Sequence, residues 1–347
     1  MEMTSITGAK SAGKTMPTVA ISHPAISVAM SVYNGAPYLA EAIESILAQS
    51  FGDFEFLIVN DGSSDGSGEM IDAYAAKDSR IRAIHQDNRG FVASLNRMID
   101  EASSNWIARM DSDDIALPTR FAVQWDWLQA HPDYGVLGTA IQEIDAEGRL
   151  LDTFRPVPFS HEAMMDKAAT GPLVHHFSAM MRRDVVQSVG GYHAAFKHCE
   201  DYDLWLRLLD VTRLANLPDV LMLYRRHEAQ VTESNRAEQV FNAAIAYEAF
   251  IERQAGRSDP TAALCQMPSL EHLDALFDRP IRDALLNKVA PQLLHSSSAL
   301  EGDGFDLILK GLNTGQSIPG AWRTVLRLAK LGCPDRALKL AANLAFR

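Results

Sequence analysis

Three carboxylates fall within four residues, at Asp111, Asp113 and Asp114. Such closely spaced negative charges repel one another unless a cation neutralises them, and carboxylate oxygens are the ligands that Mg²⁺ or Mn²⁺ prefers. The other interpretation is a solvated turn, because acid-rich turns are common. The three acids directly follow the apolar run Trp106–Met110. This place at the end of a predicted strand favours the metal site.

A second polar cluster begins at Asp61, which closes the apolar run Phe54–Asn60. Gly62 allows a tight turn there, and an ionised carboxylate could accept hydrogen bonds from a ribose or a base. A simple turn of Asn, Asp, Gly and Ser would explain the same residues without a ligand. Both interpretations stay open on this motif alone.

A pair of acids, Glu200 and Asp201, precedes a predicted helix whose buried face includes Leu204, Trp205 and Leu208. Acids in the first turn of a helix complement its dipole, which is a sufficient structural reason for them. A preorganised carboxylate is also what a general base for a hydroxyl group requires. The pair is therefore a candidate for proton transfer.

The elements that position these residues alternate between strand and helix. The apolar runs 27–33, 54–60, 81–84 and 106–110 are predicted strands, separated by segments with helical spacing. This order predicts an open, mostly parallel sheet covered by helices on both faces. Ligands of such sheets bind beyond the carboxyl ends of the strands, where all of these polar clusters lie.

Three regions are expected along the chain: a flexible tail over 1–24, an α/β domain over 25–235 and a helical C-terminal region over 236–347. Within the tail, Gly8–Thr15 matches the phosphate-binding pattern GxxxxGK[ST]. That loop functions only between a strand and a helix, and neither is predicted around it. We therefore interpret the match as chance.

Composition excludes several classes of protein. The formal charge of −12 argues against nucleic-acid binding, and three distant cysteines predict no disulfide framework. The sequence has no apolar run of about eighteen residues and no apolar secretory segment at its N-terminus, so we expect a cytoplasmic protein. Residues 310–347 carry seven Lys or Arg and one Asp. This basic end predicts either peripheral contact with the inner face of the membrane or an ordinary solvated helical hairpin.

Together, the motifs Ser31–Asn34, Asn60–Ser63, Asp111–Asp114 and Glu200–Trp205 resemble glycosyltransferase family 2 in order and spacing, over about residues 26–230. The resemblance implies the GT-A fold, a Rossmann-like, mostly parallel mixed sheet. It also implies an inverting transferase that uses Mn²⁺ or Mg²⁺. The donor would be a nucleotide diphosphate sugar with uridine as the favoured base, and the acceptor a glycan or lipid-linked hydroxyl in surface polysaccharide or glycolipid assembly.

For the donor, the resemblance implies that Tyr33 and Asp61 hold the nucleotide, with Asp61 on the base or ribose. Arg89 falls where the family continues the donor pocket. Asp111 would contact the ribose or the sugar.

For catalysis, the resemblance implies that Asp113 binds the metal and that Asp201 is the catalytic base, with Glu200 helping to position the acceptor. His227 matches a position that completes the metal site in some GT-A enzymes, although an isolated histidine is more often structural. His176 lies in a family-like segment.

Two other classes remain as alternatives, a nucleotidyltransferase and a catalytically inactive module that binds a nucleotide or glycan. The acid at Asp201 favours an enzyme, because a pure binding module gains little from a base opposite a metal.

Overall fold

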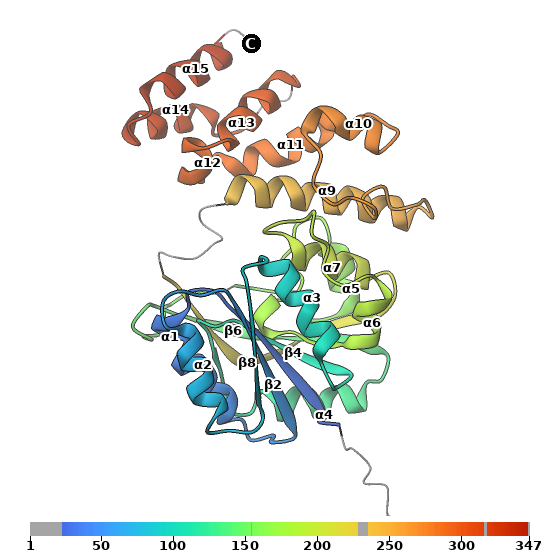
Figure 1. Ribbon diagram of the computed structural model, residues 1–347. Helices are drawn as coiled ribbons and strands as arrows, with labels where there is room; N and C mark the ends of the chain where they lie inside the picture. The colour runs from blue at the N-terminus through green and yellow to red at the C-terminus, as the bar shows by residue number, and fades with distance from the viewer. Residues whose placement is uncertain (1–22, 154, 228–234, 316–317, 346–347) are drawn as a thin grey trace, which may run out of the picture.

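The computed structural model describes residues 23–153, 155–227, 235–315 and 318–345. Nearly all of the predicted tail 1–24, including the Gly8–Thr15 pattern, lies outside the described residues. In Figure 1 an α/β domain forms one half of the molecule, and a stack of helices lies against one of its ends.

The described residues of the α/β domain form one eight-stranded sheet with the strand order β3-β2-β1-β4-β7-β6-β8-β5. The strands are β1 Ile26–Val32, β2 Phe54–Asp61, β3 Ile81–Gln86, β4 Trp106–Met110, β5 Ile115–Ala116, β6 Tyr134–Ile144, β7 Met180–Arg182 and β8 Arg213–Arg225. Strands β1 to β4 pair in parallel, β6 pairs with β8 in parallel, and β5 and β7 run antiparallel to their neighbours. The predicted mostly parallel mixed sheet is confirmed.

The central strands are continuously apolar because both of their faces are covered. Val28 and Met30 of β1 lie in one hydrophobic cluster, and Ala29 lies in the other, on the opposite face. Residues of α1, α2 and α4 fill the first cluster, and residues of α3, α5, α6 and α7 join the second. These helices span α1 Ala36–Leu47, α2 Ser67–Ala75, α3 Phe91–Glu101, α4 Arg120–Ala130, α5 His161–Lys167, α6 Arg183–Ser188 and α7 Glu200–Leu208. The predicted cover on both faces is confirmed.

The chain after Arg236 is helical, as predicted. Its helices are α9 Arg236–Gln254, α10 Leu273–Leu276, α11 Arg282–Leu293, α12 Ser297–Glu301, α13 Gly304–Asn313, α14 Ala321–Lys330 and α15 Pro334–Ala345, and short 3₁₀ turns occur at His176–Ser178 and Leu270–His272. Helix α9 packs on α7, and the apolar cluster on that face of the sheet continues into these helices. The domain boundary at 235 stays a prediction. No described helix has the length and apolar character needed to cross a bilayer.

Candidate active site

The loops after β1 and β2 are bonded to each other at the carboxyl edge of the sheet. The backbone N–H of Asn34 donates to Ser63 Oγ at 3.0 Å, and that of Ser64 donates to Asn34 Oδ1 at 2.9 Å. The N–H of Gly35 donates to Ser67 Oγ at 3.1 Å. These hydrogen bonds from backbone N–H groups to side-chain oxygens hold the two loops together as one rim.

Tyr33 lies on this rim and is 57% exposed. Gly62 adopts φ +77°, and a Cβ there would lie 2.8 Å from the backbone nitrogen of Asn88. Only glycine therefore lets the loop after β2 approach the loop after β3 this closely. An exposed aromatic ring beside a closely packed backbone loop is a suitable surface for stacking a nucleotide base.

The carboxylate of Asp61 is buried and fixes the loop between β3 and α3. Its Oδ1 accepts hydrogen bonds from Gln86 Nε2 at 2.7 Å and from the Arg89 N–H at 2.8 Å, and its Oδ2 accepts from the Gly90 N–H at 3.0 Å. Gln86 is held in turn by Arg97, whose Nη1 lies 2.6 Å from Gln86 Oε1. The structure thus brings the backbone of Arg89 to Asp61, and it adds Gln86 and Arg97 as positioning residues.

The acidic loop after β4 forms a compact group of oxygen ligands. One carboxylate oxygen from each of Asp111, Asp113 and Asp114 lies within 4.8 Å of the others. Oδ1 of Asp114 accepts the Arg225 N–H at 2.9 Å, while its Oδ2 is buried with no hydrogen-bond partner in the described part of the chain. Burial, and then the charges of Asp113 and Asp111, raise the pKa of Asp114 well above its ordinary value. An orphaned carboxylate oxygen among other carboxylates fits a hard divalent cation.

His227 lies at the same site. Its Nε2 is 2.9 Å from Asp113 Oδ2, and its ring contacts Tyr38 at a centroid distance of 4.9 Å. Arg225 connects the end of β8 to the acidic loop, because its Nε donates to the Asp113 carbonyl at 2.9 Å and its guanidinium also bonds Glu41. The predicted pair of Asp113 and His227 is therefore adjacent, and Arg225 holds the loop on which it depends.

Two buried guanidinium groups lie beneath the acidic loop. Arg109 donates to Asp111 Oδ1 at 2.5 Å and to the Ala29 carbonyl at 3.2 Å, and Arg120 donates to the Arg109 carbonyl at 2.7 Å. Burial raises the pKa of Asp111, and the charge of Arg109 opposes that shift. The positive charges partly balance the acids and keep the carboxylate of Asp111 oriented.

The acid pair at the start of α7 lies in a poorly solvated environment. Burial raises the pKa of Asp201 to about 6, with further contributions from the charges of Asp111 and Asp203. Oδ1 of Asp201 accepts the Tyr202 N–H at 2.7 Å. Burial, followed by the charge of Asp201, raises the pKa of Glu200 to about 8. Because the charge of Asp111 acts on Asp201, the start of α7 lies within electrostatic range of the acidic loop.

An aromatic group borders the acid pair. Nε2 of His176 lies 2.7 Å from the hydroxyl of Tyr192, and its ring packs edge-on against Phe91 and Trp205. Burial lowers the pKa of His176 well below its ordinary value, so its imidazole is neutral. Burial, followed by the charges of Asp201 and Glu200, raises the pKa of Tyr192. This group therefore forms an apolar wall beside the predicted base.

Comparison with known proteins agrees with this geometry. The family model described as Glycosyl transferase family 2 matches residues 27–190. The chain is 34% identical to the putative glycosyltransferase EpsE of Bacillus subtilis, over 66% of this chain and 82% of that protein. The amylovoran biosynthesis glycosyltransferase AmsE of Erwinia amylovora is 32% identical over 57% of this chain and 75% of its own, and the O-antigen biosynthesis glycosyltransferase WbnJ of Escherichia coli is 31% identical over 60% and 82%. The chain belongs to glycosyl transferase family 2.

Solved structures with the same fold are more distant in sequence. TarS 1–349 of S. aureus, crystallised with UDP-GlcNAc, superposes with a TM-score of 0.54 at 17% identity, over 92% of this chain and 91% of that one. The mannosyltransferase PcManGT of Pyrobaculum calidifontis, in complex with GDP-Man and Mn²⁺, gives 0.52 at 17% identity, over 95% and 91%. The predicted GT-A fold and the glycosyltransferase class are confirmed.

Proposed function

We propose that this chain transfers a sugar, with inversion, from a uridine diphosphate donor to a hydroxyl group, and that the reaction depends on Mn²⁺ or Mg²⁺. One observation carries the proposal: Asp201, with its pKa raised to about 6, lies within electrostatic range of Asp111 in the acidic loop. A carboxylate whose pKa lies near neutral pH, within electrostatic range of a cluster of metal-binding oxygens, suits a single displacement at an anomeric carbon.

The donor lies along the carboxyl edge of the sheet in this proposal. Tyr33 stacks on the base, and Asp61 and Arg89 define the pocket for the base and ribose, since Asp61 already fixes the Arg89 backbone. Asp111 contacts the ribose or sugar. Support for a nucleotide sugar comes from the two solved structures with this fold, which were determined with UDP-GlcNAc and with GDP-Man.

Asp113 and His227 would hold the cation, and Asp114 would supply its orphaned oxygen. When bound, it supplies Lewis-acid stabilisation of the charge that develops on the diphosphate. Arg225 keeps the loop in place through the carbonyl of Asp113 and the carboxylate of Asp114. The mannosyltransferase complex with Mn²⁺ supports dependence on a divalent cation.

The reaction then balances as one displacement. Asp201 takes the proton of the acceptor hydroxyl while that oxygen bonds to the anomeric carbon. The bond from this carbon to the donor phosphate breaks, and the nucleoside diphosphate leaves with the electron pair. Attack from the opposite face inverts the anomeric centre. Glu200, protonated at neutral pH because burial raises its pKa to about 8, can donate a hydrogen bond that positions the acceptor.

The acceptor class is proposed from the relatives. AmsE and WbnJ are named for amylovoran and O-antigen biosynthesis, and a role in surface polysaccharide or glycolipid assembly follows by analogy. A growing glycan or a lipid-linked sugar would then present the hydroxyl.

Calorimetry with a panel of nucleoside diphosphates, with and without Mn²⁺, tests the proposal, followed by product analysis with the corresponding nucleotide sugars. We expect metal-dependent binding of one nucleotide that Asp113→Ala abolishes, and release of that nucleotide only when sugar is transferred. Absence of binding under every metal condition would support an inactive scaffold instead.

A further inference from the structure

The last two helices carry positive charge that the fold does not neutralise. We define the C-terminal hairpin as α14 and α15, residues 321–345, which pack against each other at the outer end of the helical stack (Figure 1). Its five basic residues are Arg323, Arg327, Lys330, Arg336 and Lys339. Among the residues described, no carboxylate lies within ion-pairing distance of any of them. Arg327 and Arg336 donate instead to backbone carbonyl groups.

Several cations in the adjacent part of the helical region do form ion pairs. Arg253 pairs with Asp210 at 2.5 Å, and Arg279 and Lys288 pair with Glu248 at 2.8 and 2.7 Å. The cations of the C-terminal hairpin are thus not paired with carboxylates, in a chain whose formal charge is −12. Unpaired charge of this kind is available to an anionic partner.

The same hairpin exposes large apolar side chains. Trp322 and Leu326 lie one turn apart on α14 and are 56% and 69% exposed, and Leu338 on α15 is 70% exposed. The opposite face of α14 is buried through Thr324 and Leu328. Helix α14 thus has one face packed on the protein and an exposed apolar strip of Trp322 and Leu326. Beside this strip lies a basic strip of Arg323, Arg327 and Lys330.

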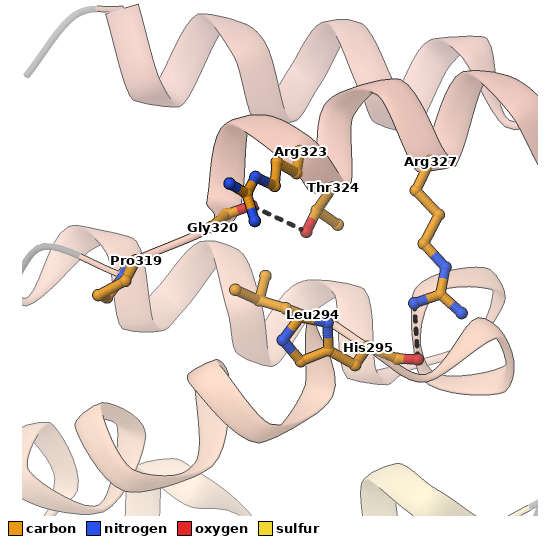
Figure 2. Close-up of a pocket in the computed structure, with 7 residues that line it drawn as sticks. All are labelled: Leu294, His295, Pro319, Gly320, Arg323, Thr324 and Arg327. Atoms are coloured by element: carbon orange, nitrogen blue, oxygen red, sulfur yellow. Dashed lines mark hydrogen bonds between the residues drawn. The ribbon is translucent and has the colours of Figure 1, made fainter.

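A cavity of about 360 Å³ lies beneath the basic strip. Figure 2 shows that Arg323 and Arg327 reach toward it from α14, while Leu294 and His295 line its other side. Three nitrogen-bearing side chains around one hollow suit a phosphate-sized group.

We propose that the C-terminal hairpin docks on an anionic lipid bilayer, with Trp322 and Leu326 in the interface and Arg323, Lys330 and Lys339 on lipid phosphates. Indole and leucine beside unpaired cations are the combination that interfacial helices use. A second copy of this chain is a less suitable partner for the hairpin. Two copies that met symmetrically through it would bring like charges together. Docking through the hairpin does not depend on which donor or acceptor the chain uses.

Flotation of the full chain with vesicles tests the proposal, comparing phosphatidylcholine alone with phosphatidylcholine mixed with phosphatidylglycerol. We expect binding only to the mixed vesicles, weakened by salt. Each basic residue near an anionic surface contributes roughly a fivefold increase in partitioning, so the triple change of Arg323, Lys330 and Lys339 to Gln should reduce binding by roughly a hundredfold. The matched control changes Lys77, Lys167 and Arg282 to Gln, all exposed elsewhere, and should bind nearly as well as the original chain.

Tryptophan emission reports the apolar part of the contact, because Trp322 is exposed and the other four tryptophans are buried or half-buried. Emission should shift to shorter wavelength with mixed vesicles, and W322F should abolish the shift. Leu326→Ala should weaken flotation. Leu150 is about as exposed as Leu326 but lies outside the hairpin, so Leu150→Ala should not weaken it. Circular dichroism confirms that each variant is folded. Equal binding of the two Gln triples, no binding to mixed vesicles, or a lipid-free dimer that W322A dissociates would overturn the proposal.

Discussion

Nε2 of His227 lies 2.9 Å from Oδ2 of Asp113, although 114 positions separate the two residues in the sequence. The contact joins the end of β8 to the loop after β4, and Arg225 reinforces it from two residues earlier. The metal-binding residues of the proposed site are therefore assembled by the pairing of distant strands.

The contact predicts that His227 contributes to metal affinity. We expect His227→Ala to weaken Mn²⁺-dependent nucleotide binding by at least about 10- to 100-fold, the range typical for loss of a group that only supports a metal ligand, and Asp113→Ala to abolish it. Titration calorimetry at several Mn²⁺ concentrations measures both effects. His272→Ala, on the distant helical region, serves as the control. Unchanged Mn²⁺ dependence in His227→Ala would assign this histidine a structural role.

A second prediction concerns the donor pocket. Gln86→Ala removes the 2.7 Å hydrogen bond to Asp61 and releases Arg97 from the same network. Since a hydrogen bond to a charged group contributes about 1.5–3 kcal/mol, the nucleotide Kd should rise by roughly tenfold or more, with turnover at saturating donor changed by less than about twofold. Gln292→Ala, an exposed glutamine on α11, should change neither. A large loss of turnover with unchanged Kd would contradict this role.

The pH dependence follows from Asp201. Its pKa is raised to about 6, and a base must be ionised to accept a proton, so turnover should fall about tenfold per pH unit below pH 6 and level off above it. Turnover measured from about pH 5 to 9 at saturating donor and acceptor gives the acid limb. A profile that stays flat down to pH 5 would exclude a base with this pKa.

Stability should show the cost of burying Glu200. Its pKa in the folded chain is about 8, above its ordinary 4.5, so the folded state favours the protonated form. The free energy of unfolding is then highest below about pH 4.5 and falls as the pH rises through 8. Glu200→Gln should be more stable than the original chain by about 1–3 kcal/mol at pH 9 and no more stable at pH 4. Chemical denaturation at both pH values tests this, with the exposed Glu301→Gln as control.

Much of the sheet could be predicted from local pattern. Strands β1 and β2 are buried on both faces, so their apolar runs stood out, and the polar residues directly after them marked the carboxyl edge. The elements β6 and β8 were not predicted. In β8 the burial is interrupted by three exposed residues, and the register with β6 shifts, so no regular alternation marks this strand.

The residues that position the site were less predictable than the residues proposed to carry the chemistry. Asp61, Asp111, Asp113 and Asp201 could be singled out because they lie at the ends of predicted strands or at the start of a helix, in motifs whose order and spacing together resemble glycosyltransferase family 2. Arg225 bonds to Asp113 and Asp114, more than a hundred positions earlier, and its local sequence gives no sign of that distant partner. Such contacts depend on which distant strands pair in the fold, and the local sequence around each residue does not indicate that pairing.

The central claim is that Asp201 removes the acceptor proton, and a paired measurement on Asp201→Asn tests it most directly. Donor affinity is measured by calorimetry with Mn²⁺, and turnover by release of the nucleoside diphosphate, with the exposed Asp166→Asn as the matched control. We expect turnover to fall by about 10²–10⁴-fold while the donor Kd stays within about threefold. Retained turnover, or a loss of donor binding as large as the loss of turnover, would contradict the assignment of Asp201 as the base.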